Sequence, residues 1–225
     1  MFGLISAGIS AIAGGLSAVG SAIGAACSAV GGAVISAGRV AVDALSRGLP
    51  MFEKICDVAL TVGKGLGIFP PEGKDVDMYE LGMRTERAVE GGVTSEQFDS
   101  NQAYIEHLRE KIDLSKADKE NLENLSDDDK LKYAGIGSAM AFATINEKYD
   151  IEIPDTFWTT GANLGIEPEQ FKPMLDVFET AKVTPDIEGF QKGELSSELQ
   201  REIYDLIDER LIEVLGNETT EKFLS

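Results

Sequence analysis

The first 38 residues of the chain combine regularly spaced aliphatic side chains with small ones, and no charged residue precedes Arg39. The aliphatic side chains are three or four positions apart, a period of about 3.5 residues that predicts a helix with one narrow apolar stripe. We expect this aliphatic stripe to face lipid or a protein partner. It consists of Ile5, Ile9, Ile12, Leu16, Val19, Ile23, Val30 and Val34, with Ala26 at one place where a large side chain is due.

A second stripe of the same segment consists of small residues, which would make one side of the helix flat. Each glycine inside a helix costs about 0.5–1 kcal/mol relative to alanine, and no ion pair within the segment offsets that cost. Because small residues let helix backbones approach closely, we expect this side to pack on other helices in a homo-oligomer or a larger assembly. The candidate packing positions are Gly14, Ser17, Gly20, Ser21, Gly24, Ser28, Gly31 and Gly38.

The length of the uncharged run limits its geometry. A membrane span needs about 20 residues, and this run is nearly twice as long, so it forms either one long helix or a helical hairpin. A turn is most favourable at Gly14–Gly15 or at Gly31–Gly32. A secretory signal peptide would have a basic residue before its apolar segment, and none is present. The regular aliphatic spacing argues against a flexible linker. Membrane insertion and burial inside a protein assembly both remain open.

The rest of the chain has the pattern of an ordinary helical protein. Residues 51–66 form an amphipathic helix, and Pro70–Pro71 with flanking glycines marks a boundary. Thr94 and Gln97 have the spacing of a capping box, which predicts a helix start. Residues 127–149 contain a small-residue run and are expected to form a tightly packed central helix. The predicted fold class is all-α: a Gly/Ala/Ser-rich N-terminal helix or hairpin, followed by a compact acidic helical domain. The predicted divisions are an arm (1–48), a second helix (49–69), a linker (70–74) and the acidic domain (75–225).

Charge is distributed unevenly along the chain. The sequence has 20 Lys and Arg against 39 Asp and Glu, a net charge of −19. Residues 1–50 carry Arg39, Arg47 and Asp43, a net charge of +1, so residues 51–225 carry −20. Binding to nucleic acid through phosphate neutralisation needs clustered basic residues, and the acidic domain is not expected to do so. The same charge favours solubility and repels anionic lipid headgroups.

Catalytic and metal-binding patterns are missing from the sequence. The only histidine is His107, so a two-histidine metal site cannot be assembled, and no Gly-x-Ser-x-Gly motif of a serine nucleophile is present. Cys27 and Cys56 form no CxxC motif, and Cys27 is expected to be a buried, inert thiol. We therefore expect no cofactor, no metal and no catalytic residue. An enzyme that uses only carboxylates and tyrosines of the acidic domain is a minor alternative.

The N-terminal 40 residues resemble glycine-zipper membrane-inserting proteins, which occur among effectors of contractile injection systems and among phage proteins ejected into a host envelope. The resemblance is carried by Gly20, Gly24, Gly31 and Gly38 together with the aliphatic stripe. It implies a non-enzymatic, self-associating protein that forms a pore or channel. Such a protein would be soluble in the cytoplasm before loading, then associated with a virion or injection particle, and finally located in a target-cell envelope. The alternative is a structural component of a phage tail or injection machine, with the arm inside a protein channel or bundle.

Overall fold

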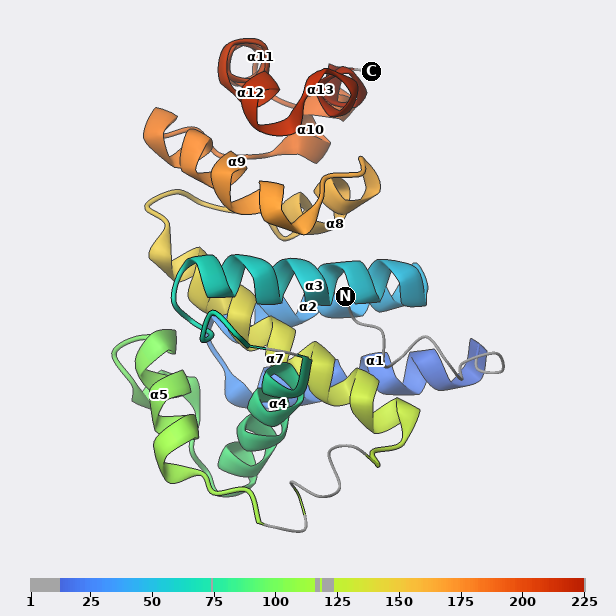
Figure 1. The fold of residues 1–225 in the computed structure, drawn as a ribbon, viewed down its shortest axis with the longest axis vertical. Coiled ribbons are helices and arrows are strands. Elements are labelled where there is room, and N and C mark those ends of the chain that lie inside the picture. The colour runs from blue at the N-terminus through green and yellow to red at the C-terminus, as the bar shows by residue number, and fades with distance from the viewer. Residues whose placement is uncertain (1–12, 74, 116–117, 119–123, 225) are drawn as a thin grey trace.

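A computed structural model describes residues 13–73, 75–115, 118 and 124–224. Within these residues the chain is helical and no strand is present, so the predicted all-α class is confirmed (Figure 1). The helices are α1 (Ala13–Val30), α2 (Ala33–Ser46), α3 (Leu49–Gly65), α4 (Asp75–Glu90), α5 (Asn101–Lys111), α7 (Asp127–Lys148), α8 (Asp155–Asn163), α9 (Pro168–Ala181), α10 (Ile187–Lys192), α11 (Ser197–Leu206), α12 (Ile212–Leu215) and α13 (Asn217–Leu224). A 3₁₀ turn covers Ser95–Gln97, and a π-helical turn, Ile207–Leu211, joins α11 to α12.

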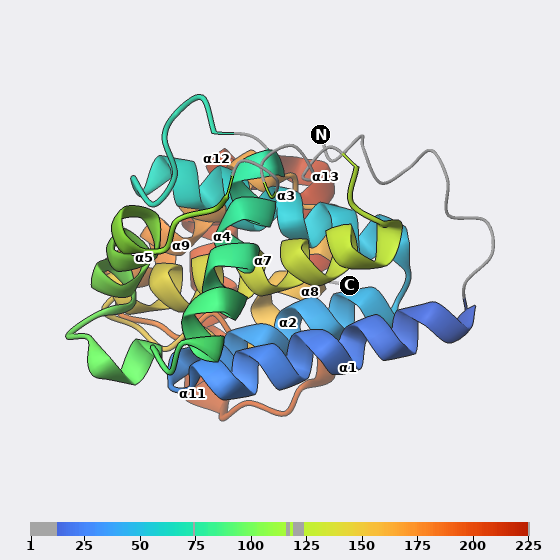
Figure 2. The ribbon, with the colours of Figure 1, turned by 90° about the horizontal axis from the view of Figure 1, so that it is seen from below.

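Helix α7 is the centre of the fold, as the small-residue run predicts. Leu131 and residues 134–145 are buried in it, and α1, α2, α3 and α4 all pack against it (Figures 1 and 2). Glycine makes the closest of these approaches possible. A Cβ atom at Gly137 would strike the backbone of Met78 in α4, and one at Gly82 would strike the backbone of Tyr133 in α7. Ser126 caps the start of this helix, because its hydroxyl accepts a hydrogen bond from the Asp129 amide at 3.2 Å.

Helices α1 and α2 form an antiparallel hairpin along one side of the molecule (Figure 2). The chain turns at Gly31 and Gly32, whose φ angles of 87° and 55° lie in the region that favours glycine. One of the two predicted turns is therefore used, whereas Gly14 and Gly15 belong to α1. The hairpin, rather than the single long helix, is the form taken by the described part of this segment.

Helix α3 connects the hairpin to the upper layer of the molecule, formed by α8 to α13 (Figure 1). It packs on α7, α2 and α9. The side chains predicted for its apolar side are all buried: Phe52, Ile55, Cys56, Ala59, Leu60 and Val62. The apolar side of α3 is therefore covered by other helices of the same chain.

The predicted boundary at residues 70–74 does not separate two cores. Residues from both sides of it, from Val19 to Phe223, contribute to one hydrophobic core. In the described part of the chain, the segment predicted as an arm thus lies against the acidic helices and does not stand apart from them. The physical reason is that an aliphatic stripe in water needs apolar cover, and the small-residue face of α7 supplies it.

The capping box predicted at Thr94 does not form, and no side chain caps the 3₁₀ turn. Helix α5 begins later, after Ser100, whose hydroxyl accepts a hydrogen bond from the Ala103 amide at 3.0 Å. The short helix predicted between Ser115 and Leu125 lies largely outside the described residues.

Candidate helix-packing site on the hairpin

The aliphatic stripe of the hairpin faces the core of its own chain. Val19, Ile23, Val30 and Val34 are at most 5% exposed, and Leu16 is half-buried. Ile23 packs directly on Gly135 of α7, where an added Cβ would lie 2.9 Å from Cγ1 of Ile23. In the folded chain these side chains therefore do not face lipid or a separate partner, because α7 covers them. Ile5, Ile9 and Ile12 lie outside the described residues.

Cys27, and not Ala26, completes this stripe. The Cys27 side chain is 1% exposed, and burial raises the pKa of its thiol to about 12. Gly38 of α2 lies opposite, where an added Cβ would be 2.7 Å from the Cβ of Cys27. Gly38 is thus the point at which α1 and α2 cross closely, so this glycine is used within the chain.

The small-residue stripe lies on the other side of α1 and borders a surface groove. The groove begins as a hollow of about 570 Å³ between α1 and α2 and continues as a second hollow of about 460 Å³ toward the turn. We call the two hollows together the hairpin groove. It is lined by Leu16, Ser17, Gly20, Ser21, Gly24, Ser28, Ile35, Gly38, Arg39, Val42, Asp43, Leu45 and Ser46.

Two serines of this groove, Ser21 and Ser28, form their hydrogen bonds within α1. Ser21 donates to the carbonyl oxygen of Ser17 at 2.9 Å, and Ser28 donates to that of Gly24 at 2.8 Å. Both hydroxyls are therefore satisfied within the helix. Ile35, one of the few exposed large apolar residues in the described part of the chain, also lines the groove. A second helix could cover Ser21 and Ser28 without leaving either hydroxyl unpaired.

Two glycines in the groove have no evident role in the folding of the chain itself. An added Cβ at Gly24 would meet nothing within 4 Å, and one at Gly20 would make only ordinary contacts with Val42 and Leu45. Gly31 and Gly38, by contrast, are needed for the turn and for the helix crossing. Gly20 and Gly24 each cost helix stability without any compensation inside the described fold. Contacts inside the described fold therefore do not explain why these two positions are glycine.

Ser95 and Glu96 contact the tip of the hairpin and were not among the predicted site residues. The Ser95 hydroxyl donates to the carbonyl oxygen of Val30 at 3.1 Å and lies 3.4 Å from that of Gly31. The Gly32 amide donates to Oε1 of Glu96 at 3.3 Å. These contacts join residues more than 60 positions apart, so no local sequence pattern predicts them.

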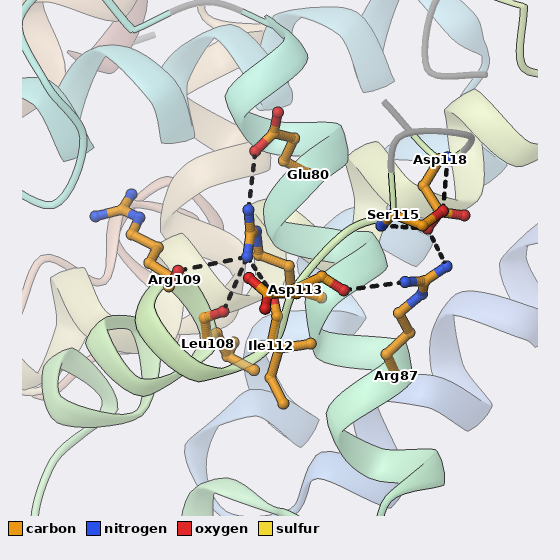
Figure 3. A network of polar contacts seen from close by, with 9 residues as sticks. Glu80, Arg87, Leu108, Arg109, Ile112, Asp113, Ser115 and Asp118 are labelled. Atoms are coloured by element: carbon orange, nitrogen blue, oxygen red, sulfur yellow. Dashed lines mark hydrogen bonds and ion pairs between the residues drawn. The ribbon is translucent and has the colours of Figure 1, made fainter. Parts of the chain in front are cut away.

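A polar network binds α4 to the end of α5 (Figure 3). The Arg84 guanidinium donates to the carbonyl oxygens of Leu108, Arg109 and Ile112. These carbonyls are at the C-terminus of a helix, where no intrahelical donor remains and a cation is favoured. Arg84 therefore has a structural role, as a cap for α5.

The segment after α5 is held in the same network. Arg87 forms an ion pair with Asp118 at 2.5 Å, and Ser115 and Asp118 exchange hydrogen bonds of 2.7 and 3.1 Å. The hydrogen bond from Ser115, followed by that from Arg87, lowers the pKa of Asp118. Ser115 and Asp118 thus have the reciprocal hydrogen bonds of a helix cap. Among the described residues, no group of three or more metal-ligating side chains is present.

No helix in the described ranges combines the length and the apolar character needed to cross a membrane. No protein-family model matches the chain, and no curated protein or solved structure is significantly similar to it. The function is therefore inferred from the geometry of the hairpin and from the chemistry of the sequence.

Proposed function

We propose that this chain is a non-enzymatic, self-associating protein whose N-terminal hairpin leaves its own core and inserts into a membrane. A phage or contractile injection particle would deliver it, in line with the glycine-zipper resemblance. The observation that carries the proposal is the division of the hairpin into two sides. One side, the aliphatic stripe, is stored against α7, and the other, the hairpin groove, contains glycines that the chain itself does not use.

The two sides would exchange environments on insertion. Lipid would replace α7 as the cover of the aliphatic stripe, while the grooves of neighbouring copies would pack together through their small residues. No charged side chain lies between residue 13 and residue 38, so this part of the hairpin would carry no charge into the apolar phase.

Burial of the aliphatic stripe against α7 makes a large contribution to the stability of the fold. Full burial of a valine or isoleucine side chain stabilises a fold by about 1.5–3 kcal/mol. Val19, Ile23, Val30 and Val34 together contribute roughly 6–12 kcal/mol on this basis, which is comparable to the 5–15 kcal/mol stability of a typical domain. Release of the hairpin is therefore expected only where another apolar environment replaces α7.

A reversible disulfide between α1 and α7 tests whether release is required. A Cβ at Gly135 would lie 2.9 and 3.4 Å from Cγ1 and Cγ2 of Ile23, close to the distance of about 3 Å between a Cβ and the far sulfur of a disulfide. The variant Ile23→Cys with Gly135→Cys, in a Cys27→Ala background, is expected to form this bond on oxidation. We expect the reduced variant to float with liposomes and release trapped dye, and the oxidised variant to do neither.

The same protein in its two redox states provides the matched control, because sequence and charge are identical. Equal flotation of both states would contradict the need for release. If neither the wild-type chain nor the reduced variant binds vesicles, membrane insertion is wrong.

A second candidate function is that of a structural component in a phage tail or injection machine. The length of α2 favours it, because α2 has 14 residues, whereas a membrane span needs about 20. In this case the hairpin groove would pack on a protein bundle. The chain would then assemble in aqueous solution without binding vesicles.

A further inference from the structure

The tip of the hairpin lacks caps of its own. Helix α1 has no basic residue in its last turn, and α2 has neither an acidic residue in its first turn nor a side-chain cap at Gly32. Helix ends normally satisfy their free backbone groups with such residues. Both ends at this tip are instead served by the 3₁₀ turn at residues 95–97.

Each of the two residues serves one helix end. The Ser95 hydroxyl donates to the carbonyl of Val30 at the end of α1. The Glu96 carboxylate accepts from the amide of Gly32 at the start of α2, where the helix dipole favours a negative charge. Ser95 is 7% exposed, so water cannot easily replace its hydrogen bonds while the hairpin is docked.

The segment that contains the 3₁₀ turn is also fixed by hydrogen bonds that do not involve the hairpin. The Tyr104 hydroxyl donates to the carbonyl of Val93 at 3.2 Å, and the side-chain amide of Gln97 donates to the carbonyl of Gly92 at 2.8 Å. Ser95 and Glu96 therefore present a preformed receptor for the hairpin tip.

We propose that Ser95 and Glu96 form a latch that keeps the hairpin docked and sets how often its tip opens. This inference rests on the proposed function, in which opening precedes insertion. The latch acts at the turn, between the end of α1 and the start of α2. Its loss is expected to let the hairpin open from the tip while the remaining helices stay folded.

The thiol of Cys27 reports opening without any membrane. Cys27 is one helical turn from the tip, since the Gly31 amide donates to its carbonyl oxygen at 3.2 Å, and its side chain is covered by Gly38. A soluble thiol reagent can reach it only after α1 separates from its neighbours. The experiment uses the full chain with Cys56→Ala, so that Cys27 is the only remaining thiol.

We expect Ser95→Ala to increase the labelling rate of Cys27 roughly tenfold, the effect of losing a hydrogen bond of typical strength and leaving buried carbonyls unpaired. Glu96→Gln, at an exposed position, is expected to give a smaller increase in the same direction. The control is Ser196→Ala, which removes a comparable cap from α11, where the Leu199 amide donates to the Ser196 hydroxyl at 3.3 Å. It should leave the rate unchanged at equal global stability.

Labelling rates that follow global stability alone, alike in Ser95→Ala and Ser196→Ala, would overturn the latch. Vesicle flotation of the same variants separates this result from failure of the proposed function. Faster labelling without flotation would keep the latch and reject membrane insertion. Flotation that is independent of the labelling rate would reject the latch as the control of insertion.

Discussion

Individual glycines of the hairpin have distinct roles, which follow from what an added Cβ would touch. At Gly38 it would strike Cys27, whereas at Gly24 it would meet open space. Both residues are in helices, so alanine gains the same helix propensity at each position. The difference in stability between the alanine variants at these two positions therefore reports the contact that Gly38 makes with Cys27.

We expect Gly24→Ala to raise the free energy of unfolding by about 0.5–1 kcal/mol and Gly38→Ala to lower it by about 1–3 kcal/mol, the usual cost of overpacking. Urea denaturation of the two variants measures both values. If the groove serves self-association, Gly24→Leu should also shift the protein toward the monomer in analytical ultracentrifugation, with its fold intact. Destabilisation by Gly24→Ala would mean that this glycine is used within the chain after all.

The buried thiol of Cys27 makes stability depend on alkaline pH. Its folded pKa of about 12 is above the 9.0 of an exposed thiol because burial disfavours the thiolate. Between these values the unfolded chain loses the proton and the folded chain keeps it, so the stability falls as pH rises through this window. The free energy of unfolding is expected to fall by about 1.4 kcal/mol per pH unit because of this group. Tyr104, whose pKa burial also raises to about 12, adds to the slope above pH 10.

Cys27→Ala is expected to remove the contribution of the thiol and leave that of Tyr104. Urea denaturation at several pH values between 9.0 and about 12, the window in which the thiol contributes, measures the difference. Identical slopes in the variant and the parent chain would show that the thiol is already accessible to solvent.

Helix packing around α7 is close at three glycines, but the neighbouring group differs. Gly82 and Gly137 face backbone atoms of the partner helix, whereas Gly135 faces the flexible end of the Ile23 side chain. A backbone cannot move aside as a side chain can. The contact between α4 and α7 is therefore more rigid than the contact between α1 and α7.

We accordingly expect Gly137→Ala to cost more than about 3 kcal/mol of stability, beyond the usual range for overpacking, and Gly135→Ala to cost about 1–2 kcal/mol. The two variants should also differ in which region loosens. Hydrogen exchange of Gly135→Ala is expected to accelerate in α1 and α2 only, whereas Gly137→Ala should accelerate it throughout the core. Uniform acceleration in both variants would mean that the hairpin does not open as a separate unit.

The features that can be predicted from the sequence depend on local interactions. The features that cannot be predicted depend on contacts between distant segments. The turn at Gly31–Gly32, the buried side of α3 and the central position of α7 follow from local spacing, because a helix reports its buried face every three to four residues. The docking of the aliphatic stripe on α7 and the contacts of Ser95 with Val30 do not. They join segments more than 60 residues apart, and nothing in the local pattern distinguishes α7 from lipid as an apolar cover. The capping-box prediction at Thr94 was wrong because both groups of Gln97 bond elsewhere: its backbone amide donates to the carbonyl of Thr94, and its side-chain amide donates to the carbonyl of Gly92.

At the scale of the whole molecule, the strongest asymmetry is between an uncharged hairpin segment and a body of high negative charge. The net charge of −19 arises outside residues 13–38. Copies of the chain therefore repel one another unless they meet through the side that carries the hairpin groove. Arg39 and Asp43, which line one end of the groove, have opposite charges and add no net charge there.

This asymmetry predicts how vesicle binding depends on lipid charge and salt. The acidic helices are repelled by anionic headgroups over about 10 Å at 0.1 M salt and about 3 Å at 1 M, so they hinder the approach of the hairpin to such a surface. We expect flotation with phosphatidylcholine vesicles to exceed that with vesicles that also contain phosphatidylserine, and the difference to shrink as salt rises. Binding that is stronger to the anionic vesicles and declines with salt would instead place Arg39 and Arg47 at the membrane surface. In that case the acidic helices would have to be turned away from the bilayer before the hairpin inserts.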